Sequence, residues 1–369
     1  MKQPLAGLRV AIVHDWLLGG GAERVVAELH RMFPDAPVYT SYCTDEWRGR
    51  LDGKVITGYL QRVGFLRKYV PFLRAWWFSH LDLSGFDLVI SSSGAEAKGV
   101  RVKKPALHIN YCHAPTHYYW SRYNEYMQRP GFPTGFNWLA RLGLKLLVGP
   151  MHRWDYRAAQ RPDAIIANST YTQTKIKEYY GRESIVIHPP IDTDRFAQIA
   201  QPVRHGFIVT GRQTPYKRID LAVAACTQLG APLTVVGKGP DHERLVKLAG
   251  PTVTFVTNAS DEEVVQSLAS AEAFLFPVLD DFGIAPVEAM AAGTPVLAYK
   301  AGGALDYVVT GETGLFFAEQ TTESLIECIQ SFKPSLFKPT LISQAAQQFS
   351  VEHFRKQLET ELKTLVVSL

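Results

Sequence analysis

The chain has 369 residues, of which 46% are hydrophobic and 20% are charged, which excludes a disordered protein and suits two domains of ordinary size. Its net charge of +4 is unevenly spread, because residues 1–190 carry 25 Lys or Arg and 15 Asp or Glu, whereas residues 191–369 carry 14 and 20. No apolar run approaches the ~18 residues of a membrane span, we see no signal peptide, and the four cysteines are scattered. We therefore expect a cytoplasmic protein with reduced thiols, whose first half faces something anionic.

The first half alternates short apolar runs with helical spacing. The apolar runs end in small or polar residues and lie at residues 8–16, 86–93, 107–113 and 164–169. Apolar strands that alternate with helices are typical of a parallel, doubly wound sheet, whose ligands bind beyond the carboxyl ends of the strands. We predict one such domain over residues 1–190.

The pattern restarts after a Pro- and Asp-rich stretch, which we interpret as a linker over residues 191–204. The predicted strands of the second sheet are residues 205–211, 231–239, 253–257, 271–278 and 294–300. This predicts a second Rossmann-like domain over residues 205–346, and two facing sheets would leave a cleft between the domains. Residues 347–369 are expected to form a helix capped by Ser350, which must pack on structure already built.

A glycine loop, Gly19 to Gly21, separates the first strand from the helix at residues 21–33. It is not a dinucleotide fingerprint, because Arg24 occupies the last glycine position and no acid follows at the required spacing. We interpret this loop as a close backbone approach to a phosphate or a sugar.

Two segments mix basic and aromatic residues. Residues 59–80 contain no acid, and their basic residues are Arg62, Arg67, Lys68 and Arg74. Residues 126–161 hold six basic residues and one acid, together with Trp138 and Trp154. Such segments suit the interface of an anionic membrane. Buried aromatics with solvated arginines, or a nucleic-acid groove, would show similar composition.

The stretch NYCHAPTHYYW places Cys112, His113 and His117 close together. Pro115 prevents the two histidines from sharing a helical face, and no second ligand pair follows, so we expect no metal site. His113 ends a predicted strand. It is either a polar group that faces the cleft or a core histidine.

Charged residues and glycines follow several strands of the second sheet. Arg212 and Lys217 precede a helix, where free N–H groups and two cations suit an anion, although surface charge would look the same. Asp280 and Glu288 flank the loop after residues 271–278. We predict that the next helix starts at Pro286, so that Glu288 lies in its first turn, as a ligand or as a partner of the helix dipole. Cations, carboxylates and glycine turns at one sheet edge suit a nucleoside diphosphate.

With these stretches assembled, the chain resembles the retaining glycosyltransferases of family 4, glycosyl transferases group 1. The similar segments run from HDWLLGGGAERVV through SRYNEYMQ, IIANSTYTQTKIKEYYG, PPIDTDRF and GRQTPYKRIDLAV to DDFGIAPVEAMAAGTPV. The resemblance implies the GT-B fold: two Rossmann-like, doubly wound parallel-sheet domains that face a cleft, and a C-terminal helix that crosses back to the first domain.

The most similar subgroup uses GDP-mannose to build O-antigen and related lipopolysaccharide or surface polysaccharides. The resemblance implies transfer of mannose to a lipid-linked, undecaprenyl-diphosphate type saccharide, by front-face displacement with retention and without metal or cofactor. Glu288 would hold the ribose, Asp280 and His113 the donor sugar, and Arg212 and Lys217 the diphosphate. The other implied donor-binding residues are Gly20, Gly21, Gly237, Thr257, Phe282, Gly283, Ile284 and Ala285.

Three positions depart from the family pattern and bear on the choice of donor. Asp280 replaces the usual Glu, His117 stands where relatives often have Arg, and Thr257 replaces a common Gly.

The implied partners are a nucleotide sugar, a lipid-linked saccharide and an anionic membrane surface contacted around Arg62–Trp77 and Arg141–Trp154, but no nucleic acid. Peripheral attachment to the inner face of the plasma membrane is expected. Three alternatives stay open: a UDP-sugar-dependent transferase, a GT-B epimerase acting on the nucleotide sugar alone, and a non-catalytic binder of nucleotide sugars.

Overall fold

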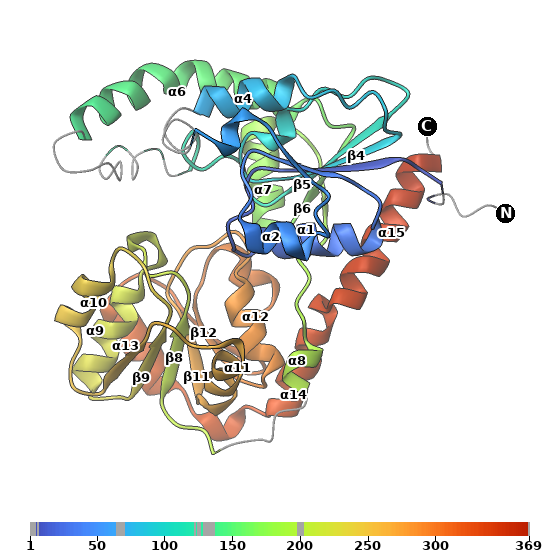
Figure 1. Ribbon diagram of the computed structural model, residues 1–369. Helices are drawn as coiled ribbons and strands as arrows, with labels where there is room; N and C mark the ends of the chain where they lie inside the picture. Colours follow the sequence, from blue (N-terminus) through green and yellow to red (C-terminus); the bar gives the residue numbers. More distant parts are fainter. Residues whose placement is uncertain are drawn as a thin grey trace. The chain divides into compact units, whose positions relative to one another are not determined.

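The computed structural model describes residues 5, 7–63, 71–121, 123, 127, 137–197 and 203–367. The chain forms two compact units (Figure 1). Unit 1 consists of Met1–Pro189 and Arg355–Leu369, and unit 2 consists of Pro190–Phe354. The stretch that the sequence assigned to a linker starts inside unit 2, because the apolar side chains of Ile191 and Phe196 are buried in its core. Residues 198–202 of that stretch lie outside the described residues.

Unit 1 is built on seven parallel strands in the order β3-β2-β1-β4-β5-β6-β7. The strands are β1 (Val10–His14), β2 (Val38–Thr40), β3 (Val55–Thr57), β4 (Leu88–Ser93), β5 (Leu107–Cys112), β6 (Ala164–Ala167) and β7 (Ile185–Val186). Every residue of β1, β4 and β5 is buried, as expected for strands covered on both faces. The sequence analysis did not predict β2, β3 and β7, which have only two or three residues each.

The main helices of unit 1 are α1 (Ala22–Met32), α2 (Asp45–Arg50), α4 (Pro71–Ser79), α6 (Asn137–Ala159) and α7 (Thr170–Tyr180). Short 3-10 turns lie at η1 (Tyr59–Gln61) and η2 (Ala97–Gly99). Ala75 of α4 clusters with Met151 of α6, and the two helices lie side by side in Figure 1. They carry the two segments that the sequence analysis assigned to a membrane surface.

Unit 2 has six parallel strands in the order β10-β9-β8-β11-β12-β13. They are β8 (Phe207–Thr210), β9 (Leu233–Val236), β10 (Val253–Val256), β11 (Ala273–Phe276), β12 (Val296–Tyr299) and β13 (Gly314–Phe317). The helices are α8 (Asp194–Ala197), α9 (Ile219–Leu229), α10 (His242–Leu248), α11 (Asp261–Ser270), α12 (Ile284–Ala291), α13 (Thr322–Ser331) and α14 (Pro339–Ala346). The five strands predicted here are present, because each was a continuous apolar run.

The last helix, α15 (Val351–Val367), belongs to both units. Ser350 caps it as predicted, since its Oγ accepts a hydrogen bond from the backbone N–H of His353 at 3.2 Å. From Arg355 onward α15 belongs to unit 1, where the Arg355 guanidinium donates to the buried Glu28 carboxylate of α1. The predicted fold class, two Rossmann-like parallel sheets with a C-terminal helix that returns to the first domain, is confirmed.

Candidate active site

The second acid of the predicted pair lies inside a helix. β11 ends at Phe276 and α12 begins at Ile284, so Pro286 is the third residue of α12. The predicted helix start at Pro286 is therefore wrong, because a proline is tolerated throughout a first turn whose N–H groups lack helical partners. Glu288 is the fifth residue of α12 and is buried, so the interpretation of Glu288 as a first-turn partner of the helix dipole no longer holds.

The first acid contacts one of the predicted cations. Lys217 lies in η3 (Pro215–Lys217), between β8 and α9, and its Nζ is 2.5 Å from Asp280 Oδ2. The two side chains are 24% and 19% exposed. Lys217 Nζ also lies 5.2 Å from the centre of the Tyr216 ring. A pair that stays partly hydrated is weakly held, so each partner can turn to a ligand.

The other cations of this edge differ in their surroundings. Arg212 follows Gly211 at the end of β8 and is exposed. Arg218 contacts two side chains, since its Nε lies 3.3 Å from Asp220 Oδ1 and its Nη1 lies 3.3 Å from Gln320 Oε1. Arg212 is therefore the exposed cation of this edge, whereas Lys217 and Arg218 each contact a carboxylate of the chain.

Glycines bring the loops of this edge together. Gly237 has φ +121°, and a Cβ there would collide with the carbonyl oxygen of Gly211 in the loop after β8. In the same way, a Cβ on Gly303 would collide with the backbone at Phe282. Gly303 N donates to Asp280 O at 2.9 Å, which fixes the loop that carries this acid. These glycines serve the approach of one loop to another.

The remaining predicted residues of unit 2 lie around the same loops. Thr257 directly follows β10, and Phe282 is buried with its carbonyl oxygen accepting from the Tyr307 hydroxyl at 3.0 Å. Gly283 has φ +89° and precedes Ile284 and Ala285, the first two residues of α12. Because β8, β9, β10, β11 and β12 are parallel neighbours, the structure places all these residues at the carboxyl edge of one sheet.

In unit 1, the backbone at the start of the glycine loop donates hydrogen bonds to a nearby carboxylate. Glu23, in the first turn of α1, accepts hydrogen bonds from the N–H groups of Leu18 and Gly19 at 3.2 and 3.0 Å. A Cβ on Gly20 would lie 2.9 Å from Glu23 Oε2, and Gly21 is the N-cap residue of α1. Gly20 and Gly21 therefore pack beside this acid at the carboxyl end of β1.

His113 directly follows β5, at the same sheet edge as the glycine loop. Its Nε2 is 2.7 Å from the Ser92 hydroxyl, and its ring is 6.1 Å from the ring of His14, centre to centre. Burial, together with the nearby His14, lowers the pKa of His113 to about 3. His113 is therefore neutral at physiological pH. The described residues contain no group of three His, Cys, Asp or Glu that could hold a metal ion.

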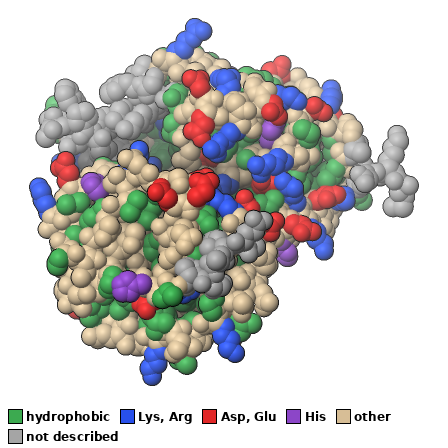
Figure 2. All heavy atoms as spheres, turned by 60° about the horizontal axis from the view of Figure 1, so that its bottom comes forward, with side chains coloured by type: hydrophobic (Ala, Val, Ile, Leu, Met, Phe, Trp, Pro, Cys, Tyr) green, Lys and Arg blue, Asp and Glu red, His purple; other side chains and the backbone are tan. Residues whose placement is uncertain are grey.

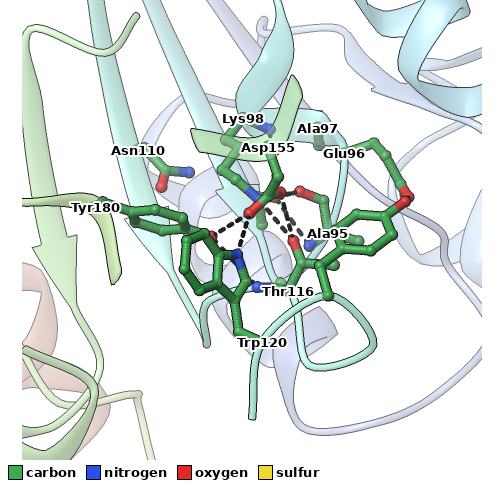
Figure 3. A network of polar contacts seen from close by, with 12 residues as sticks. Ala95, Glu96, Ala97, Lys98, Asn110, Thr116, Trp120, Asp155 and Tyr180 are labelled. Atoms are coloured by element: carbon green, nitrogen blue, oxygen red, sulfur yellow. Dashed lines mark hydrogen bonds and ion pairs between the residues drawn. The ribbon is translucent and has the colours of Figure 1, made fainter. Parts of the chain in front are cut away.

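Unit 1 also contains a buried charge network that the sequence analysis missed (Figure 3). Lys98 Nζ lies 2.6 Å from Asp155 Oδ1 and 2.8 Å from the Thr116 hydroxyl. The Asp155 carboxylate also accepts from Trp120 Nε1 at 2.8 Å and from the Tyr180 hydroxyl at 2.7 Å. One sequence signal was available, because Asp155 is the single acid in the basic segment 126–161.

A second buried ion pair shows that one cation predicted to face a membrane lies inside the protein. Arg74, predicted to face a membrane, is buried and makes two hydrogen bonds with Glu96, at 2.9 and 3.1 Å. Asp15 holds the backbone beside Glu96, because its carboxylate accepts from the N–H groups of Gly94, Ala95 and Ala97. Burial raises the pKa of Asp15, and the neighbouring His14 opposes that shift.

Only part of the two segments predicted to face a membrane exposes apolar side chains among the described residues. Trp77 is buried, and residues 64–70, with Arg67 and Lys68, lie outside the described residues, as do residues 128–136. Three exposed apolar side chains of α6 lie four residues apart: Trp138 (62%), Leu142 (47%) and Leu146 (66%). Arg141 and Lys145 are exposed beside them, and α4 adds Phe72 and Trp76. We call these seven residues the α4/α6 face.

Two further observations concern the surface of the described residues. None of their helices is long and apolar enough to span a membrane. On the face drawn in Figure 2, Lys and Arg side chains are interspersed with Asp and Glu, so the described part of that face presents no continuous basic groove.

Curated proteins with similar sequences include mannosyltransferases. A GDP-mannose-dependent alpha-(1-6)-phosphatidylinositol monomannoside mannosyltransferase of Mycobacterium tuberculosis is 28% identical over 204 residues, covering 47% of this chain and 53% of that protein. Human alpha-1,3/1,6-mannosyltransferase is 28% identical over 248 residues, covering 56% and 59%. The chain spans about half the length of the curated relatives it matches.

Solved structures share the fold over nearly the whole chain. Sucrose-phosphate synthase from Thermosynechococcus elongatus has a TM-score of 0.71 at 19% identity, covering 98% of this chain and 100% of that one. Anabaena HepE in complex with UDP has a TM-score of 0.69 at 18% identity, covering 97% and 100%. Both likenesses confirm the expected fold.

Two family models match consecutive parts of the chain. Glycosyltransferase Family 4 matches residues 19–195, and Glycosyl transferases group 1 matches residues 190–347. Together they cover every strand except β1 and the loops of both candidate edges, and the chain therefore belongs to the family 4, group 1 glycosyltransferases.

Proposed function

We propose that this glycosyltransferase transfers mannose from GDP-mannose to a lipid-linked, undecaprenyl-diphosphate type saccharide in surface polysaccharide assembly, with retention of configuration. The observation that carries the proposal is the edge of unit 2, where Lys217 contacts Asp280 and Arg212 is exposed. The mannosyl donor is supported by the GDP-mannose-dependent relative named above.

In the proposed donor complex, each charged group of this edge has one role. The cations Arg212 and Lys217 bind the diphosphate, and the Glu288 carboxylate accepts hydrogen bonds from the ribose hydroxyls. Asp280 and the backbone of residues 282–285 contact the mannose. Lys217 then exchanges part of its contact with Asp280 for a phosphate oxygen, which frees the carboxylate for a sugar hydroxyl. Because both side chains are partly exposed, this exchange costs little.

The proposed reaction takes place on one face of the sugar. The bond from mannose C1 to the phosphate oxygen breaks, and the bond from C1 to the acceptor oxygen forms on the same side. The departing phosphate oxygen takes the proton of the acceptor hydroxyl, so the products are mannoside and GDP. Arg212 and Lys217 stabilise the charge that grows on the diphosphate, which is the role that metal ions have in other transferases. We propose that no metal ion is required.

The α4/α6 face is the proposed contact with the membrane that holds the acceptor. Trp138, Leu142 and Leu146 lie on one side of α6, with Arg141 and Lys145 beside them. Apolar side chains that enter the interface, together with cations that meet anionic headgroups, are typical of a helix that lies on a bilayer. Each cation near an anionic surface contributes about 1 kcal/mol.

Transfer of a radiolabelled sugar tests the donor and the chemistry. Purified protein is incubated in EDTA with GDP-mannose or UDP-glucose and with polyprenyl-diphosphate-linked saccharides, and the lipid-extractable label is counted. We expect label from GDP-mannose only, a loss with Lys217→Ala, and normal rates with Lys247→Ala, which removes an exposed lysine of α10. Label from UDP-glucose alone would make the chain a UDP-sugar transferase, and no label from either donor would support a non-catalytic binder.

Vesicle sedimentation tests the membrane contact separately. We expect the protein to bind phosphatidylglycerol vesicles at low salt, and Leu146→Glu to reduce that binding at least tenfold. Leu341→Glu, at another exposed leucine, on α14, is the matched control. Salt should weaken binding, because exposed charges are screened at high ionic strength. Equal binding by Leu146→Glu and wild type would remove the α4/α6 face from the proposal.

A further inference from the structure

Ser92 links two histidines of the unit 1 edge. β1, β4 and β5 are neighbours in the sheet, and His14, Ser92 and His113 lie at or next to their carboxyl ends. His14 Nδ1 is 2.6 Å from the carbonyl oxygen of Ser92, and the Ser92 hydroxyl is 2.7 Å from His113 Nε2. Since a carbonyl oxygen only accepts, His14 carries its proton on Nδ1.

The same reasoning applied to the Ser92 hydroxyl gives the tautomer of His113. Ser92 is fully buried, and His113 Nε2 is the only hydrogen-bond partner of its Oγ among the residues that the structure describes. If His113 carried its proton on Nε2, the serine proton would be buried without an acceptor, which is costly. If the serine donates to Nε2 instead, its proton has a partner and the imidazole proton lies on Nδ1.

The other ring nitrogen of His113 is available to a ligand. Within the described part of the chain Nδ1 makes no hydrogen bond, and it is not one of the enclosed side-chain atoms. The ring does not gain a proton near neutral pH, because burial holds the pKa of His113 at about 3. A neutral imidazole with its proton on Nδ1 is a hydrogen-bond donor there.

We propose that Ser92 is a positioning residue, whose hydroxyl donates to His113 Nε2 and so fixes the tautomer that presents Nδ1–H to a hydroxyl of the donor sugar. The inference rests on the proposed function and on the contact between His113 and the donor sugar that the family resemblance implies. It adds that sugar transfer requires the hydroxyl group of Ser92, although Ser92 does not itself contact the substrate.

Ser91 offers a matched control for every experiment. It precedes Ser92 in β4, is equally buried, and its hydroxyl also lies next to a histidine, 2.8 Å from His108 Nε2. Since neighbouring residues of a strand point to opposite faces of the sheet, Ser91→Ala removes the same group without touching His113.

Nitrogen-15 NMR of the full-length protein with labelled histidine tests the tautomer, with His113→Gln assigning the signal. We expect a protonated Nδ1 and an unprotonated Nε2 for His113 in the wild type and in Ser91→Ala. Ser92→Ala should shift the ring toward the Nε2–H form, and Ser92→Thr, which keeps the hydroxyl, should restore Nδ1–H. A wild-type His113 with its proton on Nε2 would overturn the proposal, whether or not the mutants fold.

Kinetics then test the consequence for transfer. Ser92→Ala should lower kcat for mannose transfer about tenfold, as expected for one hydrogen bond lost in the transition state, with Ser91→Ala near wild type. Ser92→Thr should recover most of the rate. An Nδ1–H tautomer in a protein that transfers no sugar would refute the proposed function and leave the role of Ser92 on His113 intact. Full activity in Ser92→Ala would refute the positioning role.

Discussion

The two sheet edges hold their charged groups in different ways. In unit 1, the Lys98–Asp155 and Arg74–Glu96 pairs are buried, and each carboxylate is satisfied by further donors from the chain itself. In unit 2, Lys217 and Asp280 form an ion pair while both side chains are partly exposed. The loops that carry them are held by close backbone contacts at glycines such as Gly237 and Gly303.

The difference separates structural charges from charges that serve a ligand. A buried charge that has all its partners inside the protein orders the segments that carry it, and removing one partner is costly. A charge that keeps part of its hydration on a rigid backbone can change partners at little cost. By this criterion, the two buried pairs of unit 1 order α4 and α6, whereas the Lys217–Asp280 pair of unit 2 can change partners.

The largest expected effect is the difference in stability and activity between two lysine-to-methionine variants, one at each sheet edge. Lys98→Met leaves Asp155 buried without its cation and should lower the free energy of unfolding by about 3 kcal/mol, because a broken buried pair costs that much. Lys217→Met should lower it by less than about 1 kcal/mol, but reduce kcat by about 10²- to 10³-fold.

Chemical denaturation and steady-state kinetics of the two variants measure both quantities. If Lys217→Met destabilised the protein as much as Lys98→Met, the distinction between the two edges would fail.

The next largest effect concerns the glycines of unit 2. Gly303→Ala places a Cβ against the backbone at Phe282 and should destabilise unit 2 by about 1–3 kcal/mol, as overpacking does. Gly49→Ala, in α2, meets no atom within 4 Å and is the control, with unchanged or slightly higher stability. Thermal unfolding of both variants measures the difference. Equal melting temperatures would show that the loops yield easily and that the backbone does not make this edge rigid.

A smaller effect is expected from pH and belongs to unit 1. Burial lowers the pKa of His108 to about 3, although the neighbouring Asp163 carboxylate opposes that shift. Below the ordinary histidine pKa of about 6.5, His108 binds a proton in the unfolded chain but not in the folded chain. The free energy of unfolding therefore falls as the pH drops from 6.5 toward 3. Between pH 6.5 and 5 His108 should contribute about 2 kcal/mol to this loss, since each pH unit contributes about 1.4 kcal/mol.

Denaturation at both pH values, in the wild type and in His108→Gln, measures this loss. The variant should lose less stability on acidification, and an identical loss would show that other groups cause it.

The sequence predicted the sheets better than the charges. Apolar strands such as β9 and β11 were recognised because parallel strands are buried on both faces. By contrast, β3 and β7 are too short to show any period. Pro286 was misleading as the mark of a helix start, because it fits the third position of α12 as well as the first.

Buried ion pairs could not be predicted because their partners lie far apart in the chain. Arg74 occurs in a segment without acids and looks solvated, yet Glu96 follows the next strand and folds against it. Lys98 and Asp155 are similarly separated, and no spacing rule joins them. The residues of unit 2 were easier, since loops after parallel strands meet at one edge wherever the strands are recognised.

The most direct test of the proposed donor is thermal stabilisation by GDP, GDP-mannose, UDP, UDP-glucose and ADP without added metal. Selective binding to the folded state raises the melting temperature. We predict a rise with GDP and GDP-mannose alone, and its loss in Lys217→Met, whose own stability should be close to that of the wild type. A rise with UDP-glucose but not with GDP-mannose, or an unchanged rise in Lys217→Met, would contradict the account.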